Sequence, residues 1–285
     1  MSPIVPLLLL SVIVLVSCGV TTTSTMPPQK QPARVSSKIA SVKEVIYTPA
    51  NWPAALPASI FRPSGIKDAP AVLLIHGGGW NGGDKRSQMD GLAKKLARRG
   101  YLVVSPTYRT TPQWQHPAPV EDVAQCLRWM RKNATSLNLD PSRISAFGYS
   151  AGAHLATMVG FQDDTTWPAL RGIVAGGTPA NLSLFDSGKL VRLYLGGTRE
   201  EKPARYREAS PVNHVTRDSP PVFIYHGKMD RLVPINQAEA LRTSLAAKNV
   251  GYEYHVLQGR AHITTFLFSG GTVTKAIDFL DRLNR

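Results

Sequence analysis

The chain has 285 residues, of which 43% are hydrophobic, and a formal net charge of +14 at pH 7. This length and composition predict one α/β domain with a sizeable core and an N-terminal extension. Two cysteines, Cys18 and Cys126, exclude a framework of disulfides. The positive charge predicts attraction to an anionic surface, such as lipid headgroups or a polyanionic saccharide, or simply a well-solvated basic surface. Basic residues are spread along the chain without a nucleic-acid-binding signature, so no nucleic-acid partner is expected.

The N-terminus carries a targeting pattern. Residues 1–29 hold no charged side chain, and residues 4–20 are almost wholly apolar. Such a run is more typical of a secretory signal than of a membrane span, although an uncleaved anchor and a buried helix are alternatives. Its end, Leu15-Val16-Ser17-Cys18, resembles the bacterial lipoprotein signal box. That resemblance implies a signal peptide over residues 1–17, lipidation of Cys18, and export of a protein anchored to a bacterial membrane, facing the periplasm or cell surface.

Residues 18–40 follow as a stretch rich in Thr, Ser, Pro and Gln. This composition predicts a disordered tether. We therefore expect the catalytic domain to span residues 41–285. Within it, apolar runs and helical periodicities alternate, which predicts a mostly parallel sheet with helices on both faces. The expected strands are 42–47, 58–62, 71–75, 101–105, 144–147, 172–175, 222–226 and 252–257, and the expected helices are 91–99, 119–132, 235–248 and 272–283.

The stretch that organises the domain is Gly148-Tyr149-Ser150-Ala151-Gly152. It lies between an apolar run and a helix-compatible segment, which predicts a sharp strand–helix turn that exposes the Ser150 hydroxyl at a helix N-terminus. Alone, this short pattern also fits an ordinary turn. A second pattern lies upstream, where His76-Gly77-Gly78-Gly79-Trp80 follows a buried strand. Its glycines leave backbone N–H groups free to stabilise a developing oxyanion, although a flexible turn is the simpler alternative.

A nucleophilic serine needs a base, and the base needs a carboxylate to orient it. Asp230 directly follows the strand expected at 222–226, where the acid of a serine hydrolase would lie. His262 lies between the last strand and the last helix, where the base would lie. The other six histidines have less suitable positions. His76 is expected to orient the loop formed by Gly77, Gly78 and Gly79, which we call the glycine loop. The predicted triad is Ser150, His262 and Asp230.

Together these motifs resemble the α/β-hydrolase superfamily, and more narrowly esterases of the hormone-sensitive-lipase and feruloyl/acetyl-xylan-esterase kind. The resemblance rests on His76–Trp80, Gly82-Gly83-Asp84-Lys85, the Ser150 turn, Asp230 and His262. It implies an α/β-hydrolase fold and oxyanion donors on the backbone of Gly78, Gly79 and Ala151. Many relatives carry an acidic residue or His where this chain has Tyr149, which bears on substrate fit.

The expected reaction is hydrolysis of short-acyl carboxylic esters, such as acetyl or feruloyl esters on plant polysaccharide, through an acyl-enzyme. No metal or organic cofactor is expected, because no metal-ligand motif is present. Residues 161–220 hold no long apolar helix, which predicts a small or absent lid. An arylformamidase-like amide hydrolase and a catalytically silent binding protein remain alternatives, and no particular oligomeric state is predicted. Residues that could wall a modest pocket, or lie in the core, are Trp80, Trp114, Trp167, Leu184, Phe185, Leu193 and Tyr194.

Overall fold

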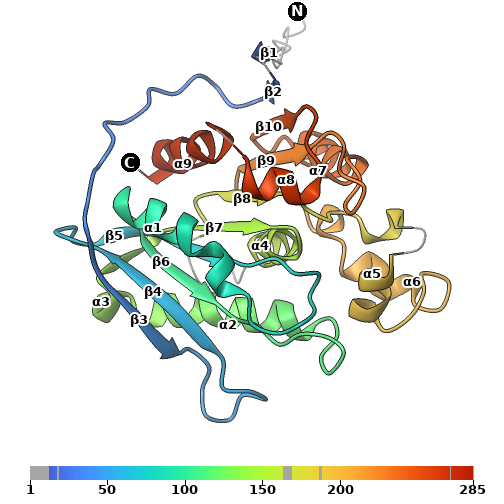
Figure 1. The fold of residues 1–285 in the computed structure, drawn as a ribbon, viewed down its shortest axis with the longest axis horizontal. Helices are drawn as coiled ribbons and strands as arrows, with labels where there is room; N and C mark the ends of the chain where they lie inside the picture. Colours follow the sequence, from blue (N-terminus) through green and yellow to red (C-terminus); the bar gives the residue numbers. More distant parts are fainter. Residues whose placement is uncertain (1–12, 18, 163–168, 186–187, 270, 285) are drawn as a thin grey trace, which may run out of the picture.

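The computed structural model describes residues 13–17, 19–162, 169–185, 188–269 and 271–284. Within these residues one ten-stranded sheet runs through the molecule in the order β1-β2-β10-β9-β8-β7-β5-β6-β4-β3 (Figure 1). The six strands from β10 to β6 are parallel, and the strands at both edges are antiparallel. The strands are β1 Ile13–Ser17, β2 Val20–Ser24, β3 Ile39–Ile46, β4 Pro57–Pro63, β5 Ala69–Ile75, β6 Leu102–Pro106, β7 Leu139–Tyr149, β8 Ile173–Gly176, β9 Val222–Gly227 and β10 Tyr252–Leu257.

Helices cover both faces of the sheet, as the sequence predicts. Alternate residues of β5 enter two separate cores: Leu73 and Ile75 pack with α2, α4 and α7, whereas Val72 and Leu74 pack with α1 and α9. The described helices are α1 Asp90–Arg98, α2 Ala118–Lys132, α3 Ala134–Leu137, α4 Ala151–Phe161, α5 Lys189–Leu195, α6 Pro203–Glu208, α7 Asn236–Ala247, α8 His262–Leu267 and α9 Gly271–Asn284. Three short 3₁₀ helices complete the fold, at Arg86–Met89, Leu182–Leu184 and Pro211–Asn213.

The segment expected to be a disordered tether begins instead with a regular strand. β2 pairs antiparallel with β10, from Val20 opposite Leu257 to Ser24 opposite Glu253. Its sequence, Val-Thr-Thr-Thr-Ser, is rich in β-branched residues that suit a strand, and β10 offers it an otherwise open edge. The tether prediction is therefore wrong for residues 20–24. Residues 1–12 and Cys18, which carry part of the predicted signal and the lipidation site, lie outside the described residues.

The strand that leads to Ser150 is longer than expected, because β7 begins at Leu139. Residues 140–143 form a local turn inside it, where the side chain of Asp140 accepts a hydrogen bond of 2.9 Å from the backbone N–H of Ser142. A register shift against β5 absorbs this local bend.

The region between residues 161 and 220 is mostly short elements, as expected. Beyond α4, the longest helix that the structure describes there is α5, with seven residues. No helix in the described part of the chain has the length and apolar character needed to cross a membrane.

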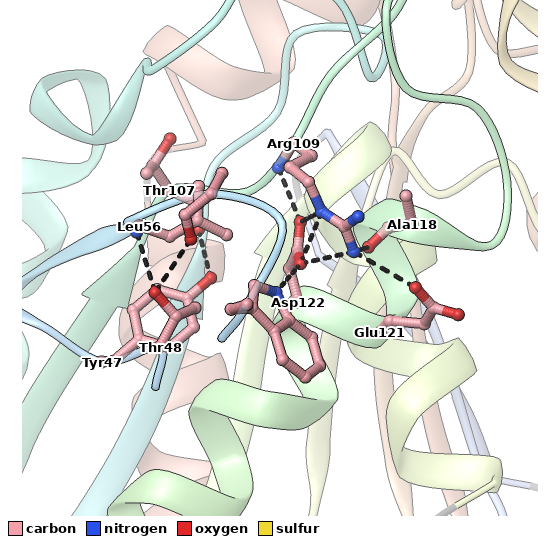
Figure 2. A network of polar contacts seen from close by, with 10 residues as sticks. Tyr47, Thr48, Leu56, Thr107, Arg109, Ala118, Glu121 and Asp122 are labelled. Carbon is pink, nitrogen blue, oxygen red and sulfur yellow. Dashed lines mark hydrogen bonds and ion pairs between the residues drawn. The ribbon is translucent and has the colours of Figure 1, made fainter. Parts of the chain in front are cut away.

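A buried ion pair fixes the segment after β6 to α2 (Figure 2). The guanidinium of Arg109 contacts the carboxylate of Asp122 at 2.8 Å, and Asp122 also accepts hydrogen bonds from the backbone N–H of Arg109 and the indole N–H of Trp52. Both charged side chains are almost fully buried. Because each charge is compensated by several hydrogen bonds, the pair is structurally tolerable in a low-dielectric core. The neighbouring Thr111 donates its N–H to the carbonyl of Trp80, so this network also supports the glycine loop.

Candidate active site

Ser150 lies on a strained turn between β7 and α4. Its backbone has φ 56° and ψ −125°, a region that non-glycine residues rarely adopt. The flanking glycines are required by contact: a Cβ on Gly148 would lie 2.2 Å from the carbonyl oxygen of Gly152, and a Cβ on Gly152 would lie 2.2 Å from that of Ile75. The expected strand–turn–helix geometry is therefore present.

His262 and Asp230 form a direct pair. The Nδ1 atom of His262 lies 2.6 Å from Oδ2 of Asp230, although the two residues are 32 positions apart in the chain. Asp230 follows β9, and its other oxygen accepts backbone N–H bonds from Leu232 at 3.0 Å and Val233 at 2.8 Å. These bonds hold the buried carboxylate in one orientation. A carboxylate so placed fixes the His262 tautomer, with a proton on Nδ1 and a lone pair on Nε2.

A second histidine contacts the same carboxylate. Nε2 of His226 lies 3.4 Å from Oδ2 of Asp230 and donates a hydrogen bond of 2.7 Å to the carbonyl of Val233. Burial lowers the pKa of His226, so this ring is neutral at pH 7. In the sequence, His226 is only the last residue of the strand expected at 222–226. Its contacts with Asp230 and Val233 are visible only in the folded structure.

Ser150 and His262 line one cavity of about 430 Å³, together with Gly78, Gly79 and Ala151. All the described residues of the predicted site therefore line this cavity except Asp230. Asp230 does not line it but is hydrogen-bonded to Nδ1 of His262. Most of the remaining wall is apolar and comes from α5, α8 and the loops beside them: Phe185, Leu190, Val191, Leu232, Val233, Ile263 and Phe266. Lys85, Gln88 and Lys189 add polar groups.

The glycine loop is held by hydrogen bonds to its carbonyl groups. Nδ1 of His76 donates to the carbonyl of Gly77 at 2.7 Å, and burial lowers the pKa of His76 to about 4, so the ring is neutral. Lys85 donates to the carbonyls of Gly78 at 3.5 Å and Asn81 at 2.8 Å. In a trans peptide the carbonyl points opposite to the next N–H. These contacts therefore turn the N–H groups of Gly78 and Gly79 away from His76 and Lys85.

Ala151 contributes its N–H differently. It is the first residue of α4, so its N–H has no acceptor within the helix. The three residues predicted to supply oxyanion donors therefore line one cavity and come from two separate elements.

The predicted pocket wall is correct only in part. Trp80 and Phe185 line the cavity. Tyr194 is instead buried behind Trp80, with the ring centroids 4.3 Å apart, and Trp114 packs under the Arg109 guanidinium at 4.8 Å. Leu184 and Leu193 are also absent from the described lining of this cavity, and Trp167 lies outside the described residues. Among the described residues no cluster of three or more His, Cys, Asp or Glu side chains could hold a metal ion.

The sequence model of the BD-FAE family matches residues 59–245, which include the glycine loop, Ser150 and Asp230. The chain belongs to the BD-FAE family. Its fold is the α/β-hydrolase fold, as expected. Over 90% of its length the chain superposes on 99% of a solved chain described as a truncated form of carbohydrate esterase from gut microbiota, with a TM-score of 0.79 and 22% identity. The thermophilic esterase Est2 of Thermogutta terrifontis is similar over 85% of this chain and 92% of its own, with a TM-score of 0.72 and 24% identity.

Curated proteins similar to this BD-FAE chain carry esterase names. Esterase LipC of Mycobacterium tuberculosis is 30% identical over 208 residues, which cover 65% of this chain and 51% of LipC. A probable isoprenylcysteine alpha-carbonyl methylesterase of rice is 30% identical over 227 residues, or 72% of this chain and 52% of the relative. The chain thus spans about half the length of the curated relatives that it matches.

Proposed function

We propose that this BD-FAE chain is a carboxylesterase-type serine hydrolase. One observation carries the proposal: Ser150, on its strained turn, faces the same cavity as His262, whose Nδ1 is bonded to buried Asp230 at 2.6 Å. A carboxylate hydrogen-bonded to Nδ1 of the histidine is the arrangement that lets its other nitrogen accept a serine proton. The esterase names of the relatives support the same reaction class.

The reaction then proceeds by acyl transfer in two steps. His262 takes the proton of Ser150 as the hydroxyl attacks the ester carbonyl, and it returns that proton to the leaving alcohol. Water repeats the sequence on the acyl-enzyme and releases the acid. In both steps the N–H groups of Gly78, Gly79 and Ala151 stabilise the oxyanion, where loss of one donor costs about 3 kcal/mol of barrier.

The substrate we propose is a short-acyl ester, with an acetyl or aryl acyl group. The apolar side chains of Leu190, Val191 and Phe185 line a cavity of about 430 Å³, which accommodates a short acyl chain. An ethyl acetate hydrolase of Pseudomonas putida, 35% identical over 113 residues, is consistent with this class. The alcohol part would then extend outward, where a saccharide can be accommodated.

We also propose that the protein is exported and held at a bacterial membrane through lipidated Cys18. The support is the apolar, uncharged run that ends in Leu15-Val16-Ser17-Cys18. Metabolic labelling with a fatty-acid probe, in the native chain and in Cys18→Ser, tests it: label on the native chain alone is expected.

The activity is tested with 4-nitrophenyl esters from acetyl to long acyl chains. We expect turnover to be highest for short chains and to vanish in Ser150→Ala, because the substitution removes the proposed nucleophilic hydroxyl. A matched control is Ser142→Ala, which alters an exposed serine at the far end of β7. Full turnover by Ser150→Ala would overturn the assignment. Turnover of aryl formamides without ester turnover would favour the amidase, and no turnover by folded protein would favour a silent binder.

A further inference from the structure

Among the described residues, the majority of the large apolar side chains that are exposed lie at the mouth of the active-site cavity. Met229, Leu232, Ile263, Leu267 and Phe268 are between 53% and 60% exposed. Leu232 and Ile263 also line the cavity that contains Ser150. We call these five residues the apolar rim. A contiguous exposed apolar patch is uncommon on soluble proteins and marks a site of interaction.

Two neighbouring segments build the rim. The loop after β9 carries Met229 and Leu232, and the segment around α8 carries the other three. The backbone N–H of Met229 donates to the carbonyl of Arg260 at 2.9 Å, and the Arg260 guanidinium lies 5.9 Å from the centroid of the Phe268 ring. The five side chains therefore belong to one surface rather than to scattered positions.

Both segments of the rim carry basic side chains. Lys228 and Arg231 are exposed on the first segment, and Arg260 is half-buried on the second. Within residues 226–235 and 257–273 the sequence has one acidic residue, Asp230, and its carboxylate is buried against His262. An apolar centre with a basic border matches the headgroup region of an anionic bilayer, where apolar side chains insert and cations meet phosphates.

The N-terminal segment reaches the same side of the molecule. Gly19 accepts a hydrogen bond of 2.8 Å from the backbone N–H of Gln258, two residues before Arg260. In Figure 1, β2 accordingly lies beside β10, with β1 on its outer side. In the sequence, the apolar residues 4–17 and Cys18 directly precede Gly19. The lipid proposed on Cys18 would therefore be attached next to Gly19, on the side of the molecule that carries Gln258 and Arg260.

We propose that the apolar rim docks on an anionic lipid bilayer, with the mouth of the cavity facing the membrane. A second copy of the chain suits this surface less well, because it would bring Lys228, Arg231 and Arg260 against the same three cations. The proposal rests on exposure and charge and does not require the esterase activity. In this orientation, esters dissolved in or projecting from the bilayer would reach Ser150 directly.

Flotation with lipid vesicles tests the docking. Every sample is the full-length chain with Cys18→Ser, so that no attached lipid contributes and residues 1–17 contribute equally to all of them. The difference in vesicle binding between variants therefore reports the rim. We expect binding to vesicles of phosphatidylcholine and phosphatidylglycerol to exceed binding to pure phosphatidylcholine by about tenfold, and to fall in high salt. The paired substitution Leu267→Ser with Phe268→Ser should reduce binding by about tenfold, because neither side chain can then insert.

The chain offers a matched control. Val42 and Ile46 on β3 are 54% and 53% exposed but lie at the opposite edge of the sheet. Val42→Ser with Ile46→Ser should leave vesicle binding unchanged. Equal binding by the Leu267/Phe268 variant and its parent, or a preference for neutral vesicles, would overturn the proposal. So would a change of oligomeric state in that variant without a change in vesicle binding. Hydrolysis of water-soluble 4-nitrophenyl acetate, measured in parallel, shows separately whether the esterase proposal stands.

Discussion

The hydroxyl of Tyr149 donates a hydrogen bond of 2.6 Å to the backbone carbonyl of His262. Tyr149 directly precedes Ser150, so one side chain links the turn of the proposed nucleophile to the backbone of the proposed base. Their rings also lie 5.1 Å apart. Burial, with Tyr225 and Asp230 nearby, raises the pKa of Tyr149, which therefore remains a hydrogen-bond donor at neutral pH.

Tyr149→Phe should lower kcat by about fivefold with little change in KM, because a neutral hydrogen bond that positions His262 is lost while the ring remains. Steady-state kinetics on 4-nitrophenyl acetate measure the effect. Tyr206→Phe is the control, since its hydroxyl also donates to a backbone carbonyl, at 3.2 Å from that of Gly197, but away from the cavity. An unchanged kcat in Tyr149→Phe would show that His262 is held without this bond.

Lys85→Met should reduce kcat by about tenfold. The substitution keeps an apolar stem against Gly78 but removes the ammonium that bonds the carbonyls of Gly78 and Asn81. The N–H groups of the glycine loop would then be less well oriented for the oxyanion. Lys95→Met, on the exposed face of α1, is the control. If KM rises while kcat stays constant, Lys85 contacts substrate rather than orienting the loop.

Asp122→Ala should destabilise the fold by about 3–5 kcal/mol, because it leaves the buried Arg109 guanidinium with only the more exposed Glu121 as a carboxylate partner. Denaturant unfolding measures the change. Asp140→Ala removes the partly exposed pair with Arg143 and should cost under about 1 kcal/mol. Similar losses in the two variants would contradict the assigned importance of burial.

Stability should also fall in mild acid because of His76. Its pKa is about 4 in the folded protein, mainly through burial, against an ordinary value of 6.5. As pH falls below 6.5, the unfolded chain binds a proton at His76 but the folded protein does not. The free energy of unfolding therefore decreases progressively down to about pH 4. For this one group the loss is about 3 kcal/mol.

The check is the free energy of unfolding between pH 7 and pH 4 in the native chain and in His76→Asn. The asparagine amide can replace the Nδ1 donor to Gly77 but does not titrate. We expect a shallower pH dependence in the variant. Parallel curves for the two proteins would contradict the role assigned to His76.

Local sequence was sufficient for the strand–turn–helix around Ser150. A Cβ at position 148 or 152 would lie 2.2 Å from backbone atoms, so both positions require glycine. The five-residue motif Gly148–Gly152 contains both glycines and is recognisable in the sequence. Buried strands were similarly predictable, since residues enclosed on both faces must form continuous apolar runs. Chain order after Ser150 also singled out Asp230 and His262, which the fold brings within hydrogen-bonding distance.

Contacts between segments far apart in the chain were not predictable in this way. The Val-Thr-Thr-Thr segment of β2 suits a strand by its composition, but the open edge of β10 with which it pairs exists only in the folded sheet. Tyr194 and Trp114 have the character of pocket residues, but Tyr194 is buried behind Trp80, and half-buried Trp114 packs against the Arg109 guanidinium.

Residue types and short spacings along the chain therefore specified the proposed chemistry, because the Ser150 turn and the glycine loop are shaped by local sterics. Tertiary structure alone decided what surrounds that chemistry: the Tyr149 bond to His262, the α5 wall with Leu190 and Val191, and the exposed rim of Leu267 and Phe268. Those features depend on which segments, far apart in the chain, become neighbours when the sheet and helices pack. A short sequence motif does not specify which segments these are.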